Sequence, residues 1–431
     1  MPVPEGTFPV AIGLIVAGLA SYLFLKVGKE ALGSDEALQP ITSLWVATFA
    51  LAPGVFLPVE QELARALAHR RAVGLGGKPV LRKVIVLGVI LAVVVSLGIV
   101  AVSPALASAF FNDDWVLVVA LLIAFVSYTP SHIARGIASG HGRFRAYAIV
   151  MASDGVVRIV FCALLAVVGV TAVGPYGLAI AFAPLPGVAW VYFRKQLRTD
   201  DGPPAEWGEV TQNLGWLLVG SVFAAGLVNA GPLAATVLAD ANEKGLVTQF
   251  TYGVLLARIP LFLFQAVQAA LLPRLSQLAA RNEIVEFREG LVRLLKMVLV
   301  VATVGTVGAY VIGPVVIEKF YGSQLSGNTL AVLAFSSAIY MLALALAQAV
   351  IALRGHKLVA LGWATAGITF LLVTWLNSGA ELFRRVEIGL VSSSAAALIM
   401  FGLALRHKLG TGVVPTGQSV IDAITDMPLE T

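Results

Sequence analysis

The sequence predicts an all-α membrane protein with about twelve transmembrane helices in two six-helix repeats. Three observations predict this fold class. The 431 residues are 58% hydrophobic and only 12% charged, whereas a soluble protein of this size carries roughly 25% charged residues. The mean hydropathy is correspondingly high, at +0.90. Apolar runs long enough to cross a bilayer recur along the chain, and parts of the first half return in the second.

Windows of about 20 apolar residues define the expected spans. The first run has no basic segment before it and is about as long as a span, so we expect a membrane helix rather than a cleaved signal peptide. The expected spans lie near 7–27, 39–59, 84–105, 115–134, 147–169, 173–193, 213–238, 246–272, 294–316, 328–352, 358–377 and 387–405.

The distribution of basic residues predicts the orientation. With both termini in the cytoplasm, 21 of the 29 Lys and Arg residues fall in inner loops and tails, and six fall in outer loops. This bias predicts a multi-pass protein of the cell membrane, and it explains the net charge of +5 without a nucleic-acid partner. The remaining two, Arg158 and Arg258, lie inside apolar runs.

Three pairs of segments relate the two halves of the chain at a nearly constant offset. The pairs are LPVEQELARALAHRR at 57–71 with LPRLSQLAARNE at 272–283, Ser103-Pro104 with Gly313-Pro314, and SGHGRFRAYAIVMA from Ser139 with LRGHKLVALGWATA from Leu353. Because six spans is an even number, the two copies keep the same orientation, as in the parallel repeats of many secondary transporters.

The duplication predicts four parts. These are an N-terminal six-helix lobe at 1–193, a cytoplasmic linker at 194–212, a C-terminal six-helix lobe at 213–405 and a cytoplasmic tail at 406–431. The linker is polar and contains Pro and Gly. No hydrophilic stretch is long enough for a soluble catalytic domain.

Asp154 and Arg158 form an acid–base pair four residues apart, about half-way through the fifth expected span. That spacing brings the side chains together on one helix face. Because a charge near the bilayer centre costs at least about 2.5 kcal/mol, it usually faces the protein interior or a wet cavity. The pair is therefore either a structural ion pair or part of a transport cavity, where Arg158 would be the member that meets a substrate.

Arg258 has no acid within a turn of its own helix, and Pro260 directly after it favours a kink. An unpaired cation beside a broken helix suits an anion site, although a partner acid elsewhere, such as Asp154, is the alternative. Gln265 and Gln268 follow roughly on the same face. They could hydrogen-bond sugar hydroxyls or serve helix packing.

Three further polar residues are candidates. Glu60 and Glu62, at a cytoplasmic mouth, could couple protons or act as a gate; the alternative is a snorkelling pair against Arg65 and Arg70. Asn229 precedes a Gly-Pro break in the seventh span and could line a cavity or make a helix–helix hydrogen bond.

The sequence gives little indication of a metal site, a reactive thiol or an enzyme active site. His141 and His356 occupy equivalent inner loops without Cys, Asp or Glu at ligand spacing, which favours a repeated turn element over a metal site. The single cysteine, Cys162, is expected to be buried and inert. No hydrolase, kinase, ATPase or redox motif is present. We therefore predict neither an enzyme nor a cofactor.

Three segments carry a resemblance that extends over nearly the whole chain. They are ALGSDEALQPITSLWVATFALAPGVFLPVEQELARAL at 31–67, SGHGRFRAYAIVMASDGVVRIV at 139–160 and ARIPLFLFQAVQAALLPRLSQLAA at 257–280. In order and spacing they resemble the polysaccharide flippases of the multidrug/oligosaccharidyl-lipid/polysaccharide exporter (MOP) superfamily, in their actinobacterial form.

This resemblance implies a V-shaped two-lobe bundle with a basic and polar central cavity. It also implies that alternating access moves an undecaprenyl-pyrophosphate-linked saccharide from the inner to the outer leaflet, for cell-surface polysaccharide biosynthesis. The implied partners are this lipid-linked substrate, a coupling ion (H⁺ or Na⁺) or the membrane potential, and the glycosyltransferases or polymerase of the pathway.

Three alternatives rank below this function. A cation-coupled multidrug exporter needs acids and aromatic residues in its cavity, and only Asp154 clearly fits. A lipid II flippase usually has additional C-terminal spans. A membrane glycosyltransferase or polymerase needs a large outer loop with catalytic residues, whereas the largest expected outer loops are short, at 27–38 and 317–327.

Overall fold

The computed structural model describes residues 7–211, 214–261, 283–353 and 355–410, together with residues 264, 275, 278 and 279. Every regular element in these residues is a helix. Eleven of the helical segments are long and apolar enough to cross a membrane. The predicted fold class is therefore confirmed. The expected span at 246–272 begins as a helix and continues beyond the described residues.

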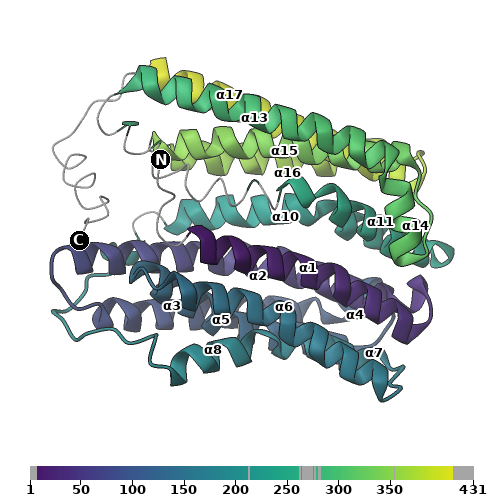
Figure 1. The fold of residues 1–431 in the computed structure, drawn as a ribbon, viewed down its shortest axis with the longest axis horizontal. Coiled ribbons are helices and arrows are strands. Elements are labelled where there is room, and N and C mark those ends of the chain that lie inside the picture. Colours follow the sequence, from purple (N-terminus) through teal and green to yellow (C-terminus); the bar gives the residue numbers. More distant parts are fainter. Residues whose placement is uncertain are drawn as a thin grey trace.

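The first half of the chain forms one bundle of helices, drawn in purple to blue in Figure 1. Its helices are α1 (Thr7–Leu32), α2 (Asp35–Ala72), α3 (Lys78–Ala101), α4 (Ser103–Phe110), α5 (Trp115–Gly140), α6 (Phe144–Val167), α7 (Val173–Phe182) and α8 (Pro184–Phe193). We call α1–α8 the N-bundle.

The second half forms another bundle, drawn in teal to yellow in Figure 1. After the short α9 (Gly208–Thr211), its elements are α10 (Leu214–Leu238), the 3₁₀ turn η1 (Ala241–Glu243), α11 (Lys244–Ala257), α13 (Ile284–Val311), α14 (Gly313–Tyr321), α15 (Gly327–Ala352), α16 (His356–Leu376) and α17 (Leu382–Gly410). We call α10–α17 the C-bundle. The expected tail begins within α17, and 411–431 lie outside the described residues.

Prolines divide three of the expected spans. Pro104 and Pro314 each stand in the first turn of the second helix, so α3 breaks before α4 as α13 breaks before α14. Pro184 separates α7 from α8 in the same way. Proline is tolerated in a first turn because the N–H it lacks has no intrahelical partner there. The breaks at Pro104 and Pro314 fall where the sequence repeat pairs these positions.

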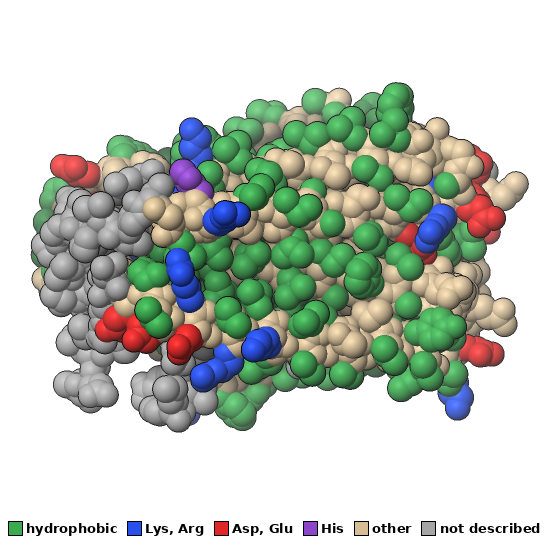
Figure 2. All heavy atoms as spheres, turned by 90° about the horizontal axis from the view of Figure 1, so that it is seen from above, with side chains coloured by type: hydrophobic (Ala, Val, Ile, Leu, Met, Phe, Trp, Pro, Cys, Tyr) green, Lys and Arg blue, Asp and Glu red, His purple; other side chains and the backbone are tan. Residues whose placement is uncertain are grey.

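Burial distinguishes central from lipid-facing helices. The most apolar window of α2 is 72% buried, whereas that of α3 and that of α13 are each 17% buried. Figure 2 shows charged side chains gathered toward the two ends of the long axis, with hydrophobic side chains over much of the face between them. The single cysteine, Cys162, is buried as expected.

The two bundles meet along α2 and α10, which run antiparallel. The hydroxyls of Ser43 and Thr236 lie 3.2 Å apart, and further along Ser221 donates to the carbonyl of Pro53 at 3.3 Å. α2 therefore has two roles. It packs among the helices of the N-bundle, and it forms the part of that bundle which contacts α10.

The linker folds back on the end of α2. Arg70, 3% exposed, donates from Nε to the Glu209 carboxylate at 2.8 Å and from Nη1 to the carbonyls of Gly76 and Pro203. The expected pairing of Arg70 with the glutamates of α2 is therefore wrong, because Glu209 of the linker satisfies it.

Candidate functional site

Arg258 lies where α11 stops. The helix ends at Ala257, and the backbone N–H of Arg258 donates to the Leu255 carbonyl. Pro260 accounts for the break, because proline has no N–H for the Leu256 carbonyl and its ring clashes there. The carboxyl end of a helix carries partial negative charge, which favours a cation. The kink expected at Pro260 thus ends α11 at Arg258.

A pocket in the C-bundle contains Arg258. It lies between α10, α11, α15 and α17, and Arg258 is the one cation among the described residues that line it. The hydroxyl-bearing side chains of the wall are Ser336, Ser337, Tyr340 and Ser394, and the rest is apolar. The cavity has a volume of about 40 Å³, and its few polar groups on an apolar wall are an arrangement that ligand pockets share.

Among the described residues, the hydrogen-bond partner of Arg258 is neutral. Its Nη1 donates to the side-chain oxygen of Asn229 at 3.4 Å, and within the described part of the chain no carboxylate forms an ion pair with it. Asp154 is not this partner, since it bonds to Tyr128 and Arg158. Among the described residues, no carboxylate therefore competes with an anion for the positive charge of Arg258.

Asn229 connects Arg258 to α2. Pro53 lacks an N–H, so the Phe49 carbonyl, four residues earlier in α2, has no intrahelical donor. The amide nitrogen of Asn229 donates to this carbonyl at 3.4 Å and to the Ala225 carbonyl at 2.9 Å. Of the two predicted roles, the helix–helix hydrogen bond is present, and the same side chain supports the arginine of the pocket.

Arg158 is enclosed in the N-bundle, with an exposure of 1%. Its Nη2 lies 3.4 Å from Asp154, which confirms the pairing predicted from four-residue spacing. The guanidinium lies over the ring of Phe49, at 4.9 Å, and that of Phe24, at 5.6 Å. Nε and Nη1 are buried without a hydrogen-bond partner. This incomplete satisfaction is costly, because buried donors normally have acceptors.

Both arginines are connected to Phe49 of α2, but Arg158 is not among the residues that line the pocket of Arg258. Arg158 lies over the Phe49 ring, and Arg258 reaches the Phe49 carbonyl through Asn229. Gln265 and Gln268, the two candidates for sugar contacts, lie outside the described residues.

Glu60 and Glu62 have different environments, although both are buried. Glu62 is bonded to Arg65 at 2.7 Å, as the snorkelling hypothesis predicts. Glu60 faces α5, where His132 lies 2.8 Å and Arg135 2.7 Å from the same carboxylate oxygen. For Glu60 the snorkelling hypothesis is therefore wrong.

Sequence reasoning missed His132 and Tyr128 and assigned Arg135 to an inner loop. All three lie on α5, at positions that share one helix face because they are four and then three residues apart. Polar residues at this spacing inside an otherwise apolar helix were the available signal. The Tyr128 hydroxyl donates to Asp154 at 2.9 Å.

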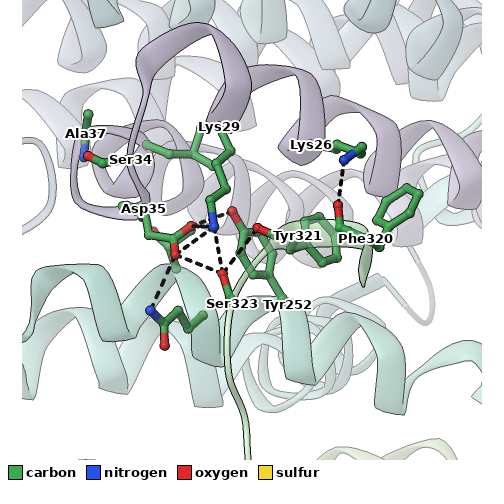
Figure 3. A network of polar contacts seen from close by, with 12 residues as sticks. Lys26, Lys29, Ser34, Asp35, Ala37, Tyr252, Phe320, Tyr321 and Ser323 are labelled. Carbon is green, nitrogen blue, oxygen red and sulfur yellow. Dashed lines mark hydrogen bonds and ion pairs between the residues drawn. The ribbon is translucent and has the colours of Figure 1, made fainter. Parts of the chain in front are cut away.

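A second set of contacts joins the bundles at the end opposite the linker (Figure 3). Asp35, at the start of α2, accepts hydrogen bonds from Lys29, Tyr252 and Ser323 at 2.9–3.0 Å. Lys29 also donates to Ser323 at 2.7 Å, and the rings of Tyr252 and Tyr321 are stacked 3.9 Å apart. We call these five residues the Asp35 network. It ties α1 and α2 to α11 and to the end of α14.

Asp35→Ala is expected to lower, about 5- to 100-fold, the ratio of molecules in which the bundles are joined at this end to molecules in which they are apart. The reason is that removing the acceptor of several charge-assisted hydrogen bonds costs about 1–3 kcal/mol. Spin labels at Glu30 and Glu318, one exposed position on each bundle, would report a longer distance distribution in a Cys162→Ala background. Asp201→Ala breaks the Lys78 ion pair near the linker and serves as the control. Unchanged distances in Asp35→Ala would contradict the expectation.

Comparisons with known proteins agree with this architecture. A family model described as lipid II flippase MurJ matches residues 116–353. An inward-facing multidrug resistance MATE family transporter of the MOP superfamily superposes with a TM-score of 0.69 and 14% identity, over 95% of this chain and 96% of that chain. The Vibrio cholerae MATE transporter VcmN gives a TM-score of 0.66 and 16% identity, over 94% and 96%. No curated protein sequence matches the chain. The structural similarity establishes a MATE-like fold.

Proposed function

Since the chain belongs to the lipid II flippase MurJ family of the MOP superfamily, we propose that it flips a polyprenyl-pyrophosphate-linked saccharide across the cell membrane. Two substrates have this chemistry. One is the oligosaccharide lipid of cell-surface polysaccharide biosynthesis, which the sequence resemblance implies; the other is lipid II, which the family model favours. Both present a pyrophosphate beside sugar hydroxyls.

The Arg258 pocket is the observation that carries the proposal. A guanidinium with a neutral partner can donate two parallel hydrogen bonds to a phosphate, which makes it a strong anion contact. The serine hydroxyls of the same wall suit the saccharide. Pro232 also leaves the carbonyl of Val228, a residue that lines the pocket, without its helical donor.

The other predicted site residues have secondary roles in the proposal. Arg158 and Asp154 meet the substrate only in a conformation in which Phe24 and Phe49 no longer cover the guanidinium. Gln265 and Gln268 contact the saccharide from the segment that follows Arg258. Glu62 keeps a local ion pair with Arg65.

Transport proceeds by alternating access of the lobes at 1–193 and 213–405. The excess of Lys and Arg in the predicted inner loops orients the linker end toward the cytoplasm. With the Asp35 network formed, the outer end is tied, and substrate enters from the inner leaflet. Release of the substrate at the outer end then requires the Asp35 network to break. A coupling ion (H⁺ or Na⁺) or the membrane potential drives this step.

A multidrug exporter of cationic compounds is the weaker candidate, although the chain has a MATE-like fold. The pocket presents a cation, which repels such substrates. Asp154, the acid half-way through the fifth expected span, is already bonded to Arg158 and Tyr128.

Proteoliposomes that contain the full chain would test the proposal. We expect flipping of a fluorescent polyprenyl-pyrophosphate disaccharide and no uptake of a fluorescent cationic dye. Fluorescent lipid II in a parallel arm distinguishes the two substrates. A neutral polyprenyl disaccharide controls for the pyrophosphate. Uptake of the dye without flipping of any pyrophosphate lipid would overturn the proposal.

A further inference from the structure

We propose that Glu60 and His132 form a proton-binding site that couples proton movement to transport. This inference rests on the proposed function and names its coupling ion. The pair lies within the N-bundle, and its side chains are almost completely buried, with exposures of 4% for Glu60 and 2% for His132. A carboxylate this deep among membrane helices is costly unless it is compensated by partners.

The side chains that compensate the charge of the Glu60 carboxylate lie on α5. Oε2 of Glu60 lies 2.8 Å from Nδ1 of His132 and 2.7 Å from Nη2 of Arg135. The same Nη2 lies 2.7 Å from Nδ1 and 3.2 Å from Nε2 of His132. With Glu60 ionised, a neutral His132 can donate its one ring proton from Nδ1 to Glu60, but Nδ1 then has no lone pair for the nearby Nη2 donor of Arg135. In this state the three side chains sum to zero charge.

One more proton changes this balance. It can bind the carboxylate of Glu60 or the free nitrogen of His132, and either choice leaves the cluster with a charge of +1. Arg135 then loses its anionic partner or faces an imidazolium. The side chain of Arg135 is 14% exposed and its Nε has no partner, so it is the group free to turn away. The cluster therefore has two arrangements that differ by one proton.

The remaining ionisable neighbours do not replace Arg135. On α6, the ring of Tyr147 lies 5.7 Å from the guanidinium of Arg135. On α5, Tyr128 lies one turn before His132, with the two rings 6.4 Å apart. Glu62, two residues further along α2, bonds to Arg65 instead.

The cluster lies at a point of close helix contact. A Cβ on Gly136 of α5 would come within 2.9 Å of the Glu60 carbonyl oxygen, so α2 and α5 nearly touch there. α2 also carries the contacts with α10. A proton that separates Arg135 from Glu60 thus loosens the attachment of the helix that forms the surface between the bundles.

A hydroxyl connects this site to the middle of the membrane. Tyr128 donates to Asp154, whose second oxygen is buried without a partner. Two carboxylates, Asp154 and Glu60, therefore lie in one polar row with Tyr128 and His132 between them. Such a row provides positions for a proton between the middle of the bundle and its linker end.

The experiment measures flipping by the full chain under a pH gradient. Proteoliposomes carry a fluorescent polyprenyl-pyrophosphate disaccharide, the membrane potential is held at zero, and the outer face is about one pH unit more acidic. We expect wild-type flipping to accelerate by up to about tenfold for each coupled proton. We expect Glu60→Gln and His132→Gln to lose this acceleration. Glu387→Gln replaces an equally buried carboxylate, paired with Arg384 in the C-bundle, and should keep it.

A dye inside the vesicles gives a second measurement, which needs no variant. Wild-type flipping should move protons into the lumen in a fixed ratio to lipid. If the wild type flips the lipid but moves no protons and ignores the gradient, the proton site is overturned and the flippase function stands. If it flips no pyrophosphate lipid, the proposed function itself has failed. A gradient response retained by a folded Glu60→Gln would also overturn the proposal.

Discussion

Replacing Arg258 with alanine is expected to slow flipping of a polyprenyl-pyrophosphate disaccharide by about 10- to 100-fold. A hydrogen bond to a charged group contributes about 1.5–3 kcal/mol, and each 1.4 kcal/mol is a factor of ten. Arg258→Lys should give an intermediate rate, because lysine keeps the charge but loses the planar pair of donors. The measurement is the initial flipping rate in proteoliposomes at equal protein density.

Two controls make the Arg258 result specific. Arg384→Ala removes a cation from the same bundle at a position whose side chain is 63% exposed and outside the pocket, and it should flip at the wild-type rate. Thermal unfolding should change little in Arg258→Ala, since the hydrogen bond it loses, to Asn229, is long at 3.4 Å. Wild-type flipping by Arg258→Ala would remove this residue from the site.

The sequence predicted features that depend on local pattern. Hydropathy located the helices because a bilayer requires spans of a minimum length, and Pro260 marked the end of α11 three residues before itself. The Asp154–Arg158 contact followed from helical geometry alone. These features need no knowledge of which helices are neighbours.

Features that depend on helix packing were not predictable in the same way. Glu60 pairs with residues 72 and 75 positions away because α2 packs on α5, and nothing near Glu60 in the chain indicates this. Asn229 finds the carbonyl that Pro53 leaves free in another bundle, 180 residues earlier. The Asp35 network likewise unites segments from α1, α2, α11 and α14. The sequence shows which polar groups need a partner, but helix packing determines which of these groups come into contact.

Asp154→Ala is expected to destabilise the protein by about 3–5 kcal/mol. The guanidinium of Arg158 would then remain buried at 1% exposure with no counter-ion, and breaking a buried pair from one side carries a cost of this size. The effect should appear as a large fall in the unfolding temperature of the purified protein. Asp240→Ala removes the carboxylate that caps η1; as the control it should cost only about 0.5–2 kcal/mol and lower the unfolding temperature less.

The double variant Asp154→Leu with Arg158→Met separates a structural from a transport role. Removing both charges eliminates the uncompensated guanidinium, so most of the stability should return. If the pair were only structural, flipping would return with stability. Under the proposed function, flipping stays slow in the folded double variant, because Arg158 meets the substrate when Phe24 and Phe49 uncover it. An Asp154→Ala protein that unfolds at the wild-type temperature would contradict the burial argument itself, since a lone guanidinium cannot occupy that position without cost.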